Sequence, residues 1–244
     1  MDTRNDTILI TGGGSGIGRA MAEALHGRGA KVIIAGRRRE ALEAVAAANP
    51  GMAFETLDVA DPEAIRTFAA KIVETHPDLN VLINNAGIMV VEDQIDLAIA
   101  EETIAINLLG PIRLTAALLP HLRSRPRASV VTVSSGLAFV PLAATPTYSA
   151  TKAAIHSWSQ SLRHQLRDTS VEVIEWAPPA VATDLMPGHA DNPNSMPLAD
   201  FTSESLALFE AGHEELLVER VKFLSGAADR GEYEQVFRAL NPVG

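Results

Sequence analysis

Residues 8–18 read ILITGGGSGIG, an apolar run that leads into a glycine-rich turn and then into an amphipathic segment. Glycines permit a tight turn and let backbone N–H groups approach an anion without interference from a Cβ atom. The first turn of a helix adds unpaired N–H donors and a partial positive charge. A strand, a glycine turn and a helix in this order predict the opening of a βαβ unit that binds dinucleotide phosphates.

Short β-branched runs alternate with segments of helical periodicity along most of the chain. We predict strands at Thr7–Ile10, Val32–Ala35, Ala53–Leu57, Val81–Asn84, Ser129–Ser134 and Val171–Trp176, with Glu215–Val218 as the candidate for a last strand. Late helices are predicted at Thr202–Ala211 and Gly231–Leu240. Nearly continuous apolar strands that alternate with helices indicate an α/β fold with a doubly wound parallel sheet of the Rossmann type.

The composition narrows the class of protein. The chain has 244 residues and a net charge of −10, which suits one domain over residues 1–244 and disfavours nucleic acids and anionic membranes as partners. It has no cysteine, which excludes disulfides, thiolate catalysis and cysteine-ligated metals. No apolar run reaches the roughly 18 residues of a membrane span, and no signal peptide is recognisable. We therefore expect a cytoplasmic protein without a membrane span.

A change of composition after residue 185 predicts a lid. Residues from about 185 to 201 are rich in Pro, Asn and Asp and indicate a long loop. Loops of that length in compact domains are commonly lids or binding loops. Met186, His189 and Met196 in this loop are candidates for contact with a substrate.

The second predicted strand runs into Gly36, Arg37, Arg38 and Arg39. NAD sites commonly place an acidic residue about 20 residues after the glycines, where it binds the ribose hydroxyls. Guanidinium groups instead attract a 2′-phosphate, so Arg37 and Arg38 favour NADP(H), with NAD(H) not excluded. The alternative interpretation is that the three arginines only solvate the start of a helix.

Tyr148 and Lys152 are four residues apart at the start of a predicted helix, so their side chains share one face. An ammonium near a phenol lowers the phenol pKa from about 10, which makes a usable general acid or base. Ser135 follows the fifth predicted strand, at the edge where open α/β sheets bind ligands. On these residues alone the pair could equally decorate an exposed helix, and Asn107 could be a buried, hydrogen-bonded amide.

Five motifs occur in one order along the chain: Thr11-Gly12-x-x-x-Gly16-x-Gly18, Asn84-Asn85-Ala86-Gly87, Asn107, Ser135 and Tyr148-x-x-x-Lys152. Together they resemble the single-domain branch of the short-chain dehydrogenase/reductase family, and residues 149–181 also resemble its DltE-like subgroup. The resemblance implies a sheet of order 3-2-1-4-5-6-7 and hydride transfer between NADP(H) and a small-molecule carbonyl or secondary alcohol. It also implies a homodimer or homotetramer.

The resemblance further implies roles for individual residues. Tyr148 would protonate the substrate oxygen, and Lys152 would lower its pKa and hold the nicotinamide ribose. Ser135 would bind the substrate carbonyl, and Asn107 would hold a water of the proton relay. Besides Tyr148 and Lys152, the implied cofactor-binding residues are Gly12, Gly14, Ser15, Gly16, Ile17, Gly18, Arg37, Arg38, Asp58, Val59, Asn84, Ala86, Gly87, Pro178, Val181 and Thr183. Pro179 departs from the usual glycine and changes the backbone beside the nicotinamide segment.

Three other classes of site or function are less well supported. The seven histidines show no metal-ligand spacing with carboxylates, so we predict no metal site. A catalytically silent dinucleotide-binding redox sensor or interaction protein would not need the Tyr–Lys pair. An isomerase or dehydratase usually carries a larger C-terminal substrate domain than the about 60 residues that follow Thr183.

Overall fold

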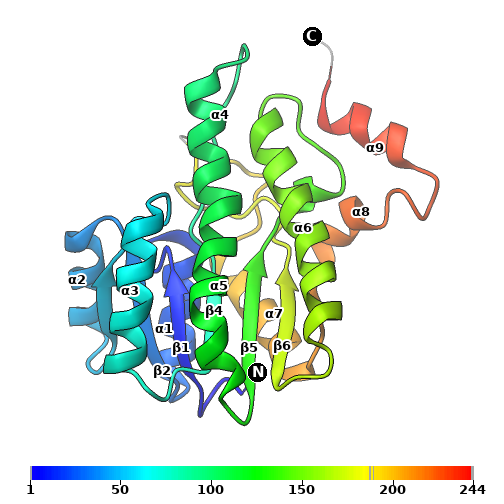
Figure 1. Cartoon of the computed structure of the whole chain (residues 1–244). Helices are drawn as coiled ribbons and strands as arrows, with labels where there is room; N and C mark the ends of the chain where they lie inside the picture. The colour runs from blue at the N-terminus through cyan, green and yellow to red at the C-terminus, as the bar shows by residue number, and fades with distance from the viewer. Residues whose placement is uncertain (1, 187, 189, 243–244) are drawn as a thin grey trace.

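The computed structural model describes residues 2–186, 188 and 190–242 (Figure 1). Within these residues seven strands form one sheet of order β3-β2-β1-β4-β5-β6-β7, and every neighbouring pair is parallel. The strands are β1 Thr7–Thr11, β2 Lys31–Gly36, β3 Ala53–Thr56, β4 Val81–Asn84, β5 Ala128–Val133, β6 Val171–Trp176 and β7 Glu215–Leu216. The predicted doubly wound sheet and its order are confirmed.

Helices cover both faces of the sheet, as Figure 1 shows. One face packs against α1, α2 and α7, and the other packs against α3, α5 and α6. The helices are α1 Gly16–Gly27, α2 Arg39–Ala48, α3 Pro62–Thr75, α4 Leu97–Ile104, α5 Gly110–Arg123, α6 Pro146–Leu166, α7 Leu198–Ala211, α8 Lys222–Ser225 and α9 Tyr233–Leu240. A π-helical segment, η1 Ala105–Leu109, joins α4 to α5, and short 3-10 turns occur at η2 Gly136–Ala138 and η3 Glu219–Val221.

The alternation of side chains along each strand explains the two buried layers. In β1, Ile8 and Ile10 belong to the cluster under α1 and α7, whereas Leu9 belongs to the cluster under α3 and α5. Successive strand residues point to opposite faces, so a strand covered by helices on both sides needs apolar residues at every position. All five residues of β1 are buried, and the three at its centre, Ile8, Leu9 and Ile10, are apolar.

The predicted loop over residues 185–201 is shorter than expected, because α7 begins at Leu198. Met196, a candidate substrate contact, is buried in the apolar core beneath α1 and α7. Pro187 and His189 lie outside the described residues. The loop is exposed at residues 190–194 and buried at Ser195 and Met196, and Met186 stays a candidate for substrate contact.

One helical run is long and apolar. Residues Leu97–Arg123, which comprise α4, η1 and α5, have a mean hydropathy of 1.4 in their most apolar window, and 44% of that window is buried inside the fold. By length and composition alone this run is long enough to cross a membrane, as core helices of many α/β domains are. It contacts α3 and α6, and its α5 part also packs on β4 and β5.

Candidate active site

The glycine turn connects β1 to α1 and has the conformation that the sequence predicts. Gly12 and Gly16 have φ angles of +71° and +53°, in the left-handed region that favours glycine. A Cβ atom on Gly18 would lie 2.4 Å from the carbonyl oxygen of Gly12, so a side chain would not fit there. Ser15, the N-cap of α1, makes no side-chain capping bond, so the first N–H groups of α1 donate no hydrogen bond to that side chain.

Asn85 attaches the end of β4 to the end of β1, a contact that the sequence analysis missed. Its Nδ2 donates to the carbonyl oxygen of Thr11 at 2.9 Å, and the hydroxyl of Thr11 accepts from the backbone N–H groups of Asn85 and Ala86. The neighbouring Asn84 points into the protein and donates to Thr115 Oγ1 at 3.1 Å. The sequence signal that could have indicated this contact is the pair of polar residues, Asn84 and Asn85, at the end of a buried strand.

The glycine turn opens onto a cleft that contains about 700 Å³ of empty space, part of it open to solvent. Arg38 Nη2 donates to Ser15 Oγ at 2.9 Å, and Arg37 lies 3.8 Å from a carboxylate oxygen of Glu102 on α4. The lining residues are Gly12, Gly14, Ser15, Gly36, Arg37, Arg38, Ala41, Leu42, Leu57, Val59, Ala86, Gly87, Ile88 and Ile106.

Eight of the predicted cofactor residues line this cleft, and the other ten do not. Thr183 lies beside the glycine turn, 3.6 Å from the place that a Cβ of Gly16 would take. Ile17 packs on the core at the start of α1. The carbonyl oxygen of Pro178 accepts from the backbone N–H of Gly136 at 2.8 Å, so the segment with Pro179 starts next to η2.

Asp58 and Val181 have other partners in the structure. Asp58 is exposed, and its Oδ1 accepts from the backbone N–H of Ala60 at 2.9 Å. Val181 is buried in the core and forms an isolated parallel bridge with Met196. Their proposed contacts with a cofactor stay predictions.

The four predicted catalytic residues meet at the carboxyl edge of the sheet. Ser135, Tyr148, Lys152 and Asn107 are between 2% and 7% exposed. Ser135 hydrogen-bonds to the Tyr148 phenol, and Lys152 Nζ lies 5.5 Å from the centre of the Tyr148 ring. Lys152 Nζ also donates to the carbonyl oxygen of Val133 at 2.8 Å.

Burial controls the protonation of this pair. It raises the pKa of Tyr148 to about 12, and the hydrogen bond from Ser135 lowers it by a smaller amount. It lowers the pKa of Lys152 to about 8. The expectation that the ammonium lowers the phenol pKa is therefore wrong, because loss of hydration raises that pKa. At neutral pH the phenol holds its proton, as a general acid must.

Asn107 is held in the π-helical segment between α4 and α5. Its Oδ1 accepts from the backbone N–H of Ile88 at 2.9 Å, and its Nδ2 donates to the carbonyl oxygen of Ile88 at 2.8 Å. A Cβ on Gly87 would lie 3.3 Å from Asn107 Oδ1 and 3.8 Å from Lys152 Nζ. Gly87 thus leaves the space in which the amide and the ammonium approach each other. π-Helical turns occur frequently at functional sites.

The start of α6 is capped from a distant loop. Thr145, its N-cap residue, makes no side-chain capping bond. Instead the carboxylate of Glu92 accepts from the backbone N–H of Thr147 at 3.0 Å and from its hydroxyl at 2.8 Å. This contact orients the helix turn that carries Tyr148.

The residues present fit a dinucleotide. Glycines leave the turn free of side chains, the N-terminus of α1 faces it, and the guanidinium groups of Arg37 and Arg38 line the same cleft. No cluster of three or more histidine, cysteine or acidic side chains suited to a metal occurs in the part of the chain that the structure describes. The arrangement joins a nucleotide cleft to a buried phenol that can donate a proton.

Known proteins are similar to this chain in sequence and in fold. The family described as short chain dehydrogenase matches residues 6–194. The chain is 41% identical to the uncharacterized oxidoreductase DltE of Bacillus subtilis (strain 168), over 99% of this chain and 98% of that protein. A short chain dehydrogenase of Burkholderia cenocepacia, solved with NADP, superimposes with a TM-score of 0.85 at 26% identity over all of both chains. A short chain dehydrogenase/reductase of Burkholderia phymatum, solved with NAD, has a similar fold with a TM-score of 0.83 at 19% identity, over 100% of this chain and 98% of that one.

Proposed function

The chain belongs to the short-chain dehydrogenase family, an oxidoreductase family, and on this basis we propose that it reduces a small-molecule carbonyl group, or oxidises the corresponding secondary alcohol, with NADP(H). One observation carries the proposal: a buried, protonated phenol lies beside a serine hydroxyl and an ammonium at the carboxyl edge of the sheet. Ligands of open α/β sheets bind at that edge.

Tyr148 is the general acid of the proposed reduction. Its raised pKa keeps the proton on the phenolic oxygen at neutral pH, ready for transfer to the substrate oxygen. The Ser135 hydroxyl would donate a hydrogen bond to the substrate oxygen and stabilise the negative charge that develops on that oxygen. Lys152 supplies positive charge next to the phenol and favours the phenolate that remains after proton transfer.

The cleft would hold the cofactor along its length. The glycine turn would bind the pyrophosphate, Arg37 and Arg38 the 2′-phosphate, and Lys152 the ribose of the nicotinamide. When bound, the nicotinamide supplies the hydride in reduction and accepts it in oxidation. The preference for NADP(H) rests on the two arginines, of which Arg38 already hydrogen-bonds to Ser15 in the glycine turn.

We also propose that the enzyme is a cytoplasmic homodimer or homotetramer without nucleic-acid or membrane partners. Ile95 and Leu97, at the start of α4, are 90% and 71% exposed, and this apolar surface supports pairing of chains. The net charge of −10 opposes binding to polyanions. Light scattering of the purified protein over a range of concentrations measures the oligomeric state.

Oxidation of NADPH in the presence of a panel of aldehydes and ketones tests the function. We expect turnover with part of the panel and a loss of about 10²- to 10⁴-fold in Tyr148→Phe, because the general acid is removed. NADPH binding should persist in that variant. Tyr233→Phe, which changes the only other tyrosine of the chain, is the matched control and should keep full activity. An equally active Tyr148→Phe enzyme would contradict the mechanism.

A further inference from the structure

A buried carboxylate interrupts an apolar row on the sheet. Val171 and Val173 of β6 point toward α6 and belong to the core beneath it. Glu175 continues this row and is 1% exposed. Removing a carboxylate from water is costly unless hydrogen-bond donors replace the water. The donors that surround Glu175 therefore indicate what the residue does.

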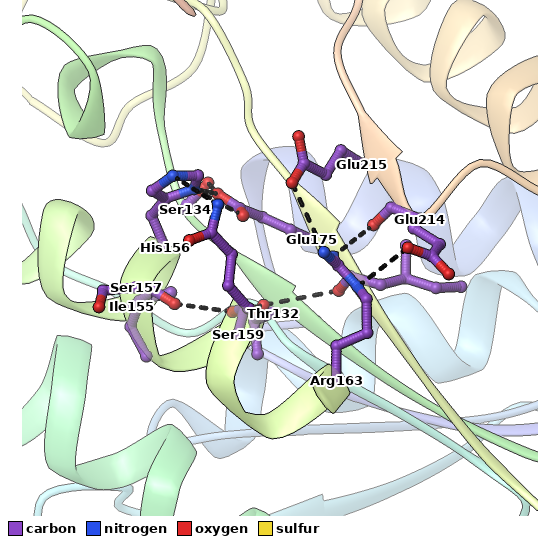
Figure 2. Close-up of polar contacts among 12 residues, drawn as sticks. Thr132, Ser134, Ile155, His156, Ser157, Ser159, Arg163, Glu175, Glu214 and Glu215 are labelled. Atoms are coloured by element: carbon purple, nitrogen blue, oxygen red, sulfur yellow. Dashed lines mark hydrogen bonds and ion pairs between the residues drawn. The ribbon is translucent and has the colours of Figure 1, made fainter. Parts of the chain in front are cut away.

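Two side chains donate to Glu175, and each comes from an element that carries catalytic groups (Figure 2). Ser134 Oγ, at the end of β5, lies 2.5 Å from one carboxylate oxygen. His156 Nδ1, on α6, lies 3.0 Å and 2.8 Å from the two oxygens. The ring of Phe139, which follows η2, contacts the imidazole edge to face, with 4.8 Å between ring centres. The imidazole is thus held between the Glu175 carboxylate and the Phe139 ring.

Ser134 precedes the catalytic Ser135. Its backbone N–H donates to the carbonyl oxygen of Trp176 at 2.9 Å, and the N–H of Gly136 donates to that of Pro178 at 2.8 Å. With the side-chain bond to Glu175, three hydrogen bonds connect the residues on either side of Ser135 to β6 and its continuation. The orientation of the Ser135 hydroxyl depends on this backbone.

His156 lies on the catalytic face of α6. It follows Lys152 by four residues and Tyr148 by eight, so the three side chains are stacked along one face of the helix. The bond from His156 to Glu175 sets the distance between this face and the strands that lead to Ser135. The Glu175 carboxylate binds Ser134 on one side and His156 on the other. It thereby connects the segment that carries Ser135 to α6, the helix that carries Tyr148.

We propose that Glu175 and His156 are positioning residues of the reaction, which hold Ser135 in register with Tyr148. This inference rests on the proposed function for the identity of the reacting groups. Catalysis is sensitive to such placement, since a displacement of about 1 Å can reduce the rate on the order of 100-fold.

The kinetic test uses Glu175→Gln, which keeps the volume of the side chain but removes the charge. With NADPH and an aldehyde or ketone that the wild-type enzyme reduces, we expect kcat to fall roughly 10- to 100-fold while the Kd of NADPH is unchanged. In a Ser135→Ala background the same substitution should cause no further loss, because the serine through which it acts is absent. If the reductions in kcat caused by Glu175→Gln and Ser135→Ala multiply in the double variant, the proposal is wrong.

Two further variants separate positioning from stability. His156→Ala should lower kcat, and His156→Asn should restore most of it, because an asparagine amide can place a donor near the position of Nδ1. Arg163→Met is the matched control. Arg163 Nε donates to the carbonyl oxygen of Val173 at 2.9 Å and joins the same helix and strand farther from Tyr148 (Figure 2). The comparison requires that Arg163→Met and Glu175→Gln lower the free energy of unfolding by similar amounts. If Arg163→Met then lowers kcat as much as Glu175→Gln does, the proposal is wrong.

A spectroscopic test needs no substrate. The chain has two tyrosines, so in a Tyr233→Phe background biosynthetic 3-fluorotyrosine places one fluorine on Tyr148. In Glu175→Gln and in Ser135→Ala we expect the ¹⁹F chemical shift at pH 7 to differ from that of the parent in the same direction, since each loses the hydrogen bond from Ser135 to the phenol. A chemical shift that moves in Ser135→Ala and stays unchanged in Glu175→Gln would refute the positioning role. Should the wild-type enzyme reduce no carbonyl compound, the proposed function fails while this test still reports on Glu175.

Discussion

Lys152 Nζ donates a hydrogen bond of 2.8 Å to the carbonyl oxygen of Val133, the last residue of β5. The ammonium on α6 thereby contacts the strand that leads into Ser135. The bond supplies one partner for a cation that has lost nearly all its water, and burial lowers the Lys152 pKa to about 8. The buried positive charge of Lys152 therefore lowers the free energy of unfolding of the protein.

Lys152→Met should change how stability depends on pH. Between pH 8 and pH 10.5 the unfolded chain binds a proton at Lys152 that the folded chain has released, so this group makes the free energy of unfolding rise with pH. Below pH 8 the cost of the buried charge is constant and amounts to at most about 3 kcal/mol. We expect the variant to be inactive and to be more stable than wild type at pH 7. At pH 10 this difference in stability should be smaller. Urea unfolding at several pH values measures the difference, and parallel profiles would contradict the prediction.

Gly18→Ala should damage both the fold and cofactor binding. The new Cβ atom would lie 2.4 Å from Asn85 Nδ2 and from the carbonyl oxygen of Gly12, so the glycine turn must shift. We expect a lower Tm and at least a tenfold weaker binding of NADPH, measured by fluorescence titration. Gly27→Ala, at the other end of α1, is the control, because nothing lies within 4 Å of its Cβ. That variant should be neutral or more stable by about 0.5–1 kcal/mol.

Arg38→Ala should reduce the preference for NADPH. Loss of a charge-assisted hydrogen bond to a phosphate weakens binding by about 1.5–3 kcal/mol, or roughly 10- to 100-fold in KM for NADPH. The KM for NADH should change little, since it has no 2′-phosphate. Arg39→Ala is the control from the same run of arginines, because Arg39 pairs with Glu43 at 2.7 Å and packs over Phe54. Equal losses with both nucleotides would argue against a 2′-phosphate site.

Glu92→Ala should destabilise the start of α6. The carboxylate caps Thr147 through two hydrogen bonds, and loss of such a cap typically costs about 0.5–2 kcal/mol. Asp93→Ala removes a neighbouring exposed carboxylate and should leave the stability nearly unchanged. Thermal or urea unfolding of both variants compares them. If the two lose the same stability, Glu92 does not act as a cap.

Much of the site was predictable because its residues follow local patterns. Tyr148 and Lys152 share a face of α6 through helical spacing, and Ser135 follows a buried strand, so the carboxyl edge of a parallel sheet brings them together. The bond from Asn85 to Thr11 was not predictable in the same way. Its partners are 74 residues apart, and no periodicity relates them.

The protonation of the phenol was also outside the reach of the sequence. Spacing places an ammonium near Tyr148 and predicts a lowered pKa, whereas burial raises that pKa to about 12. Burial depends on every element that packs over a residue and not on its neighbours in the chain. The same holds for Glu175, whose donors come from β5 and α6.

Hydrophobic periodicity and glycine spacing were enough to specify a doubly wound parallel sheet, its nucleotide turn and the residues gathered at one edge, because these features follow from backbone geometry and from the alternation of apolar side chains. Which polar groups pair across that sheet, and which side chains lose their water, depended on the packing of segments distant in sequence. Hydrogen bonding and desolvation act through space, so the links among Ser134, Glu175 and His156 could be recognised only in the folded chain.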